Sequence, residues 1–201
     1  MRYLFILNPA AGKQDCTVQL IPQLQQAAVR AGIPVDAVAT CKTEYAGHAS
    51  ELTRQAIEEG AEYILAVGGD GTVNEIARAM IHSNAILGII PKGSGNGLAR
   101  ELHIPMDVKR AIDLIAKGHV TTIDCCRANG QVFFCTCGVG FDAFVSLKFA
   151  HAGKRGLLTY LEKTLQESLK YQPETYELET ENGVSKYKAF LIACGNASQY
   201  G

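Results

Sequence analysis

The sequence has no excess of charge of either sign. Its 19 lysines and arginines stand against 20 aspartates and glutamates, which gives a net charge of -1 at neutral pH. A protein that binds nucleic acid mainly through the phosphate backbone carries a clear basic excess. The charge balance therefore gives no general electrostatic reason to expect nucleic acid as a partner.

Long apolar runs are also missing. The first run, residues 3–7, ends at the turn signal Asn8-Pro9 and is too short for a signal peptide or a membrane span. With 47% hydrophobic residues among 201, the chain can still bury a substantial core. These features predict a globular, cytoplasmic protein that is not integral to a membrane.

The seven cysteines lack the spacing of a metal site or of a secreted disulfide framework, because no C-x-x-C pair occurs among them. The densest group is Cys125, Cys126, Cys135 and Cys137. We interpret its members as reduced thiols that are buried as small apolar residues, with a metal site as the less favoured alternative. The five histidines show no metal-ligand spacing either.

The common nucleotide-binding fingerprints are absent. A Walker A loop ending at Gly12-Lys13 would need a glycine in place of Leu7 and a serine or threonine in place of Gln14. A G-x-G-x-x-G motif beginning at Gly93 fails at Leu98. A phosphate site in this chain would therefore have to be formed by other loops. Low-complexity segments, proline-rich linkers and repeats are also missing from the sequence.

Short apolar runs alternate with helical patterns in the first part of the chain, which is typical of a parallel sheet with crossover helices. We expect strands over residues 3–7, 35–39, 63–67 and 85–90, and helices over residues 18–31, 47–59, 73–81, 98–102 and 106–117. The pattern predicts an α/β domain over residues 1–119, with a three-layer arrangement around a parallel sheet.

From residue 120 the pattern changes to closely spaced strands, which predicts a β-rich domain over residues 120–201. Strands are expected over residues 120–128, 132–137, 175–180 and 185–194, with an amphipathic helix over residues 153–171. We favour packing of that helix on the protein over binding to a membrane surface. So few strands would leave open edges, so we expect this domain to be incomplete and the chain to be an excerpt.

A glycine-rich turn at residues 68–72 lies directly between a predicted strand and a predicted helix. Its glycines permit close backbone approach, so amide groups at the helix N-terminus can surround phosphate oxygens. Asp70 would repel bound phosphate unless a metal ion or a proton transfer gives it a role. A plain turn capped by Thr72 is the alternative, but it explains only Gly71 and Thr72.

A second glycine-rich turn, residues 91–97, also follows a predicted strand and precedes a helix. Loops at the carboxyl ends of parallel strands open onto one crevice, where α/β sheets bind ligands. Lys92, Ser94 and Asn96 are therefore candidate phosphate or ribose contacts, and an ordinary loop is the alternative.

Three motifs occur in a fixed order: N-P-x-x-G at residues 8–12, G-G-D-G-T-x-N-E at residues 68–75, and P-x-G-S-G-N-x-L-A-R at residues 91–100. Together they resemble the catalytic domain of the diacylglycerol kinase family, to which bacterial lipid kinases and sphingosine and ceramide kinases belong. The G-S-G-N form is more similar to the sphingosine and ceramide kinases than to the G-T-x-N-D form of many bacterial diacylglycerol kinases. The resemblance implies a fold like that of NAD kinase and diacylglycerol kinase, with a β-sandwich as second domain.

The resemblance also implies the chemistry, which is Mg²⁺-dependent transfer of the γ-phosphoryl group of ATP to a lipid hydroxyl, in phospholipid biosynthesis. It implies a nucleotide site formed by Asn8, Pro9, Gly12, Lys13, Thr40, Gly68, Gly69, Asp70, Gly71, Thr72, Asn74, Glu75, Gly93, Ser94 and Asn96. Thr40 is included because we expect it to end the second strand. Asp70 is the expected catalytic carboxylate, either linked to the metal or acting as base.

Asp142 lies in a G-x-G-x-D-A segment, residues 138–143, that in the family opens toward the lipid. It either orients the acceptor hydroxyl or caps the following helix. The family's carboxylate-rich Mg²⁺ segment and its C-terminal acidic motif, which holds the general base of bacterial diacylglycerol kinases, do not occur in these 201 residues. The metal ligands therefore stay unassigned, and the activity of this chain alone is open.

Several alternatives remain. The acceptor is diacylglycerol or a sphingosine- or ceramide-type lipid. NAD kinase shares the G-G-D-G-T turn, although residues 93–100 argue against it, and a regulatory module that binds nucleotide without turnover is the rival from another class. We expect a protein that is cytoplasmic and peripheral to a membrane, with a lipid substrate at the membrane surface and no nucleic acid; a homodimer is left open.

Overall fold

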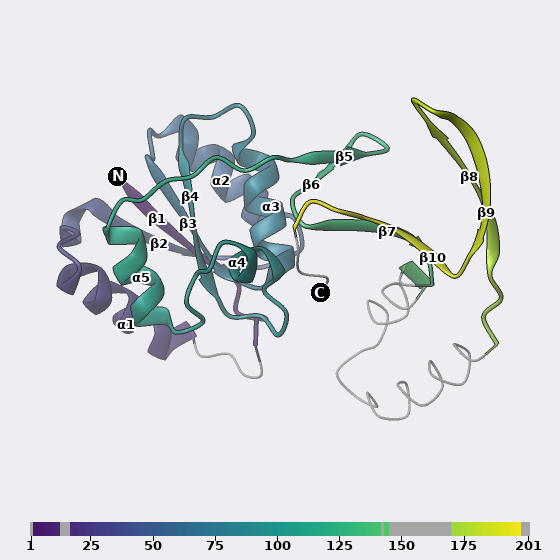
Figure 1. Cartoon of the computed structure of the whole chain (residues 1–201). Helices are drawn as coiled ribbons and strands as arrows, with labels where there is room; N and C mark the ends of the chain where they lie inside the picture. The colour runs from purple at the N-terminus through teal and green to yellow at the C-terminus, as the bar shows by residue number, and fades with distance from the viewer. Residues whose placement is uncertain (1, 13–16, 142, 145–169, 198–201) are drawn as a thin grey trace. The chain divides into compact units, whose positions relative to one another are not determined.

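The computed structural model describes residues 2–12, 17–141, 143–144 and 170–197 (Figure 1). The chain forms two compact units, one of residues 1–135 with 196–201 and one of residues 136–195. The domain boundary between residues 119 and 120 stays a prediction. The two units are described separately below.

A four-stranded parallel sheet forms the centre of the first unit. Its strands are β1 (Tyr3–Leu7), β2 (Val38–Lys42), β3 (Tyr63–Gly68) and β4 (Ile86–Pro91), in the order β2-β1-β3-β4. Leu7 lies opposite Val67, and Gly68 lies opposite Pro91. Because parallel strands in this register end at the same edge, the loops that follow β1, β3 and β4 start side by side.

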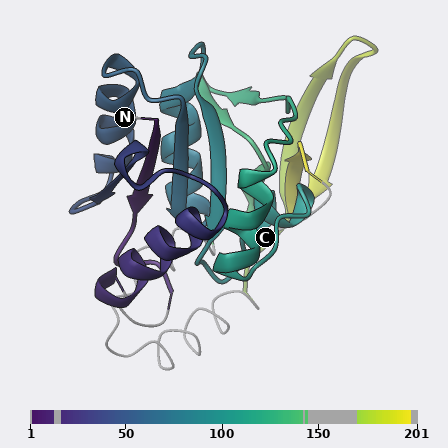
Figure 2. The same cartoon turned by 90° about the vertical axis from the view of Figure 1, so that its left-hand side faces the viewer.

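Helices cover both faces of this sheet. They are α1 (Thr17–Arg30), α2 (His48–Glu58), α3 (Asp70–Met80), α4 (Gly97–Glu101) and α5 (Val108–Ala116). Successive strand residues point to opposite faces, so Phe5 packs with α1 and α5 while Leu4 and Ile6 pack with α2, α3 and α4. Figures 1 and 2 both show α5 beside α1. The predicted three-layer α/β arrangement is confirmed.

Two elements of this unit differ from the prediction. Residues 35–37 form a 3-10 turn after Pro34, so β2 begins at Val38 and continues to Lys42. Helix α3 begins at Asp70 with the extended Gly69 as its N-cap, and the first helical hydrogen bond runs from the amide of Val73 to the carbonyl of Gly69 (3.1 Å). The predicted start of this helix at residue 73 is therefore wrong, and so is the alternative in which Thr72 caps the helix.

The later part of the chain is β-rich, as predicted, and the structure shows that its strands pair in antiparallel fashion. Strands β5 (Cys126–Ala128) and β6 (Gln131–Phe133) form a hairpin in the first unit. The two loop residues, Asn129 and Gly130, both have positive φ, the conformation of a type I′ turn. In the second unit β7 (Thr136–Gly140) pairs with β10 (Leu191–Gly195), and β8 (Glu174–Thr180) pairs with β9 (Gly183–Ala189).

Three predicted strands are shorter or divided. Only the last three residues of 120–128 are a strand, the run 132–137 is interrupted between β6 and β7, and the run 185–194 is interrupted at Phe190. The carbonyl of Phe190 accepts a hydrogen bond from the amide of Phe141 at 3.0 Å. The helix predicted over residues 153–171 falls almost entirely outside the described residues. Within the described part of the chain, no helix combines the length and the apolar character needed to cross a bilayer.

Candidate functional site

Three loops meet at the carboxyl edge of the parallel sheet. The amide of Asn8 donates a hydrogen bond to the carbonyl of Val67 at 3.0 Å, and the amide of Lys92 donates to the carbonyl of Gly68 at 2.8 Å. These bonds continue the sheet ladder beyond the strand ends. The loops after β1, β3 and β4 therefore leave the sheet as neighbours, as the sequence predicts.

The glycines of these loops serve different purposes. A Cβ atom on Gly93 would lie 2.6 Å from the Cα of Gly69, and one on Gly69 would lie 3.2 Å from the Cα of Gly93. Here two backbones touch, and neither position has room for a side chain. A Cβ atom on Gly68 would meet the side chain of Thr72 at 2.5 Å, whereas one on Gly71 would have no atom within 4 Å. Gly71 is thus the glycine that faces open space.

An open cleft of about 490 Å³ lies between the loop after β1, the loop before α2 and the first turn of α3. Its lining residues are Asn8, Pro9, Ala10, Thr43, Glu44, Tyr45, Ala46, Ala49, Gly71, Thr72 and Glu75. The side-chain amide of Asn8 donates to the hydroxyl of Thr72 at 2.9 Å, and its oxygen accepts from the amide of Ala10 at 2.9 Å. Asn8 therefore ties two walls of the cleft together.

Asp70 lies at the first position of α3 and contacts the loop after β4. Its Oδ2 accepts a hydrogen bond from the amide of Asn96 at 2.7 Å, and its Oδ1 accepts from the amide of Gly97 at 2.6 Å. The buried Asn96 in turn accepts from the amide of Gly93 (2.9 Å) and donates to the carbonyl of Gly93 (2.7 Å). Asp70 and Asn96 together hold this loop from both ends.

One of the predicted contacts, Thr40, does not line the cleft. Thr40 is in the middle of β2, paired with Phe5, so the prediction that it ends the strand is wrong. Thr43 follows the strand and donates its amide to the carbonyl of Leu7 at 2.8 Å, and it lines the cleft together with Thr72. The sequence signal for Thr43 was its position just before the loop that leads into α2.

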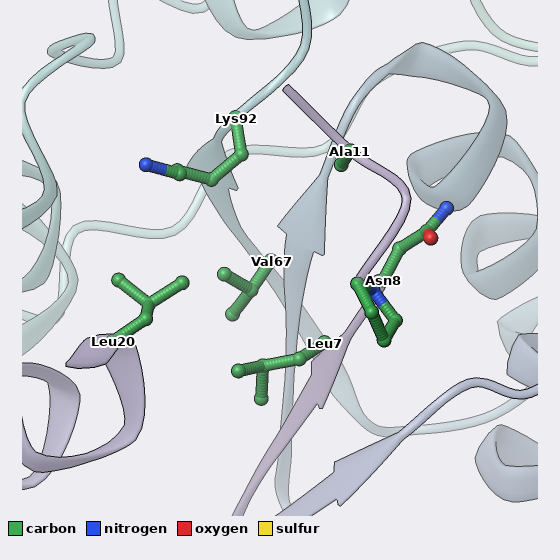
Figure 3. A pocket seen from close by; sticks show the side chains of 7 residues that line it. Leu7, Asn8, Ala11, Leu20, Val67 and Lys92 are labelled. Atoms are coloured by element: carbon green, nitrogen blue, oxygen red, sulfur yellow. The ribbon is translucent and has the colours of Figure 1, made fainter. Parts of the chain in front are cut away.

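Lys92 lies on the other side of the strand ends. It lines a small pocket with Leu7, Leu20 and Val67, and Figure 3 shows its amino group turned away from the side-chain amide of Asn8. The lysine side chain therefore lies near α1, whereas the cleft lies near α2 and α3.

The other predicted site residues do not line the cleft or lie outside the described part of the chain. Gly12 has a positive φ of 91° and would place a Cβ 3.2 Å from the carbonyl oxygen of Lys92, Asn74 lies in the first half of α3, and Ser94 is exposed in the loop after β4. Lys13 and Asp142 lie outside the described residues.

The loop before α2 contributes an aromatic pair that the sequence did not suggest. The rings of Tyr45 and His48 are stacked, with centroids 4.5 Å apart and planes at 2°. His48 Nδ1 accepts a hydrogen bond from the amide of Glu44 at 3.1 Å. The hydroxyl of Tyr45 donates to Glu51 at 2.6 Å, and this hydrogen bond raises the pKa of Tyr45 above its ordinary value.

The cysteines are free thiols wherever the structure describes them, and the described residues contain no group of three His, Cys, Asp or Glu side chains that could hold a metal ion. Cys125 is exposed, and Cys126, Cys135 and Cys137 are only partly buried, so the interpretation of this group as buried residues is wrong. Cys135 packs against the core beside α4. Burial raises the pKa of its thiol, and the nearby carboxylates of Asp70 and Glu101 raise it further.

Comparison with known proteins matches the part of the chain that contains the three motifs. The family model of the diacylglycerol kinase catalytic domain matches residues 2–128. Diacylglycerol kinases of Staphylococcus carnosus and Staphylococcus saprophyticus are 33% and 34% identical over 134 residues, which are 66% of this chain and 42% and 43% of those proteins. The chain thus spans less than half the length of these curated relatives.

The fold is similar to a crystal structure of a diacylglycerol kinase from Bacillus anthracis str. Sterne, with 27% sequence identity and a TM-score of 0.71. The match covers 98% of this chain and 65% of the chain in that crystal structure. The resemblance carried by the three motifs is therefore confirmed by a family model, by relatives in sequence and by fold. This chain belongs to the diacylglycerol kinase catalytic domain family.

Proposed function

We propose that this chain provides the nucleotide-binding part of an ATP-dependent lipid kinase that transfers the γ-phosphoryl group of ATP to a lipid hydroxyl, with diacylglycerol as the acceptor. The observation that carries the proposal is the cleft at the carboxyl edge of the sheet, where the open Gly71 and the start of α3 face the loop of Asn8. Relatives named diacylglycerol kinase support the same function.

The first turn of α3 is suited to bind phosphate. The first amides of a helix lack partners within the helix, and the helix dipole adds positive potential at this end. Because Gly71 has no side chain and open space around its Cα, phosphate oxygens can approach these amides closely. The volume of about 490 Å³ is in the range of small-molecule sites.

The other wall of the cleft is suited to bind the nucleoside. Tyr45 lines this wall next to the polar Thr43 and Glu44, and its ring is stacked on that of His48 behind it. Aromatic side chains bind the flat faces of nucleobases. We therefore assign the base to the Tyr45 side and the phosphates to the α3 side, an arrangement that fixes the direction of ATP in the cleft.

Kinases of this chemistry rely on alignment and on neutralisation of phosphate charge, which Mg²⁺ supplies when bound together with the phosphates. Mg²⁺ in such sites takes one or two protein carboxylates and completes its shell with water and phosphate oxygens. Glu75 lines the cleft and fits that requirement. Asp70 stays a candidate base or metal-linked group, although both of its carboxylate oxygens already accept amides of the loop after β4.

The lipid side rests on the family alone. We propose a lipid acceptor at a membrane surface and a protein peripheral to that membrane. Asp142, the candidate contact to the acceptor, lies outside the described residues. A sphingosine- or ceramide-type acceptor remains the second candidate because of the G-S-G-N sequence at residues 93–96.

The test measures ATP binding by calorimetry and transfer from labelled ATP to mixed micelles carrying diacylglycerol, a sphingoid base or ceramide, with NAD as a soluble acceptor. Gly71→Val should abolish ATP binding by filling the cleft, whereas Ala79→Val on the same helix should not. Label in a lipid names the acceptor, and label in NAD alone points to NAD kinase. Binding without product favours a regulatory module, and no ATP binding refutes the proposal.

A further inference from the structure

The two glycine-rich turns form one connected unit. The start of the loop after β4 is held by the bond from the amide of Lys92 to the carbonyl of Gly68 and by the contact between Gly69 and Gly93. Its far end lies beyond these two contacts and needs separate support. There Asn96 adopts a left-handed conformation with φ of 58°, which asparagine reaches more readily than most residues with a side chain but at a higher cost than glycine.

Asp70 provides that support. Its two carboxylate oxygens accept the amides of Asn96 and Gly97, which are 26 and 27 residues away in the sequence, at 2.7 and 2.6 Å. Hydrogen bonds from amides to an ionised carboxylate are short and stronger than neutral ones. The carboxylate therefore holds the loop at the left-handed Asn96 and at Gly97, the first residue of α4.

We propose that Asp70 is a positioning residue, whose carboxylate fixes the loop of residues 93–97 where it touches Gly69, two residues before the cleft residue Gly71, and affects ATP through that loop. A carboxylate that turned away to take a proton from a substrate hydroxyl would release both amides. We therefore infer that Asp70 keeps both hydrogen bonds to the loop throughout the reaction. The effect on ATP rests on the function proposed above, whereas the hold on the loop does not.

Hydrogen exchange in the nucleotide-free chain tests the hold directly. Asp70→Asn keeps one acceptor and places a donor against the second amide, so the amides of Asn96 and Gly97 should exchange at least about tenfold faster. Asp107→Asn is the matched control, because Asp107 accepts the amide of Arg110 at 2.9 Å and caps α5 in the same way. It should speed exchange in α5 and leave residues 96 and 97 unchanged.

A second measurement needs no variant, in case Asp70→Asn does not fold. Scalar coupling across a hydrogen bond, observed by NMR in the unaltered chain, should link the amide nitrogens of Asn96 and Gly97 to the carboxyl carbon of Asp70. Absence of this coupling, or unchanged exchange of both amides in Asp70→Asn, overturns the proposal.

The affinity for nucleotide separates positioning from direct chemistry. In EDTA, which removes metal ions, Asp70→Asn should still weaken ATP binding about tenfold, because the position of the loop affects ATP whether or not a metal ion is bound. Asp107→Asn should not change the affinity for ATP. An affinity that falls only when Mg²⁺ is present would identify a metal-linked group instead. An unchanged affinity with lost transfer would identify a base. If the unaltered chain binds no ATP, the proposed function fails, while the exchange and coupling data still decide the role of Asp70 in the loop.

Discussion

Gly93→Ala is the substitution whose cost follows most directly from the structure. The new methyl group would lie 2.6 Å from the Cα of Gly69 and 2.8 Å from Oδ1 of Asn96. Carbon atoms in contact are normally 3.5–4.0 Å apart, so the two backbones would have to separate by about 1 Å. Because both neighbours are held by hydrogen bonds and one is backbone, no flexible side chain can absorb this shift.

The magnitude follows from the bonds that the shift breaks. Asn96 makes two hydrogen bonds to Gly93, at 2.9 and 2.7 Å, and both depend on the present position of the loop. A net contribution of about 1 kcal/mol for each gives a loss of about 2 kcal/mol, to which strain in the loop adds. For a chain of this size the melting temperature should fall by about 4–8 °C.

Equilibrium unfolding in urea and calorimetry measure this change, with Gly71→Ala as the matched control in the neighbouring motif. An alanine at Gly71 meets no atom within 4 Å and lies in the first turn of α3, so its stability should stay equal or rise by up to about 1 kcal/mol. Its methyl group should weaken ATP binding by entering the cleft. If Gly93→Ala changes the free energy of unfolding by less than about 0.5 kcal/mol, the close contact does not constrain the loop as argued.

Two further predictions concern the cleft and its border. Thr43→Val should weaken ATP binding by up to about tenfold in calorimetry, because it removes a hydroxyl from the cleft wall, whereas Thr40→Val should have little effect; the reverse result would restore Thr40 as the contact. Burial and nearby carboxylates raise the pKa of Cys135, so iodoacetamide at pH 8 should modify it more slowly than the exposed Cys125, and equal rates would contradict this. The folded state holds this proton more tightly than the unfolded state. The contribution of Cys135 to the free energy of unfolding should be fully present below 9.0, the ordinary pKa of a cysteine thiol, and should be lost as the pH rises through the higher pKa of Cys135 in the folded protein. Urea unfolding at several pH values measures this change.

The sheet was predictable because its strands are buried on both faces. Residues 3–7 and 63–67 are nearly continuous apolar runs, which is the pattern of a parallel sheet under two layers of helices. The edge strand β2 is only half-buried, and its sequence carries a weaker pattern. Val35 and Ala37 resemble strand residues but follow Pro34 in a 3-10 turn. This shift moved the predicted strand end away from Thr43, so an error in one strand became an error in the candidate site.

The contacts of Asp70 could not be read from the sequence. A local pattern shows an acidic residue between glycines, and the choice between base, metal ligand and turn residue then depends on what the carboxylate meets in space. Its partners, the amides of Asn96 and Gly97, belong to another loop and carry no side-chain signal of this role. Only the order of strands β3 and β4 in the sheet brings the two loops together.

The glycines of residues 68–72 look equivalent in the sequence, where close approach to phosphate explains all of them. In the structure Gly68 makes room for Thr72, Gly69 makes room for Gly93, and only Gly71 faces the cleft. Two of the three thus serve contacts within the protein, which hold the loops in place. A site whose amides are already in place loses less conformational entropy on binding. The motif therefore combines one glycine that leaves the cleft open with two that permit close contacts within the protein, and substitutions at these three positions should separate ATP binding from stability.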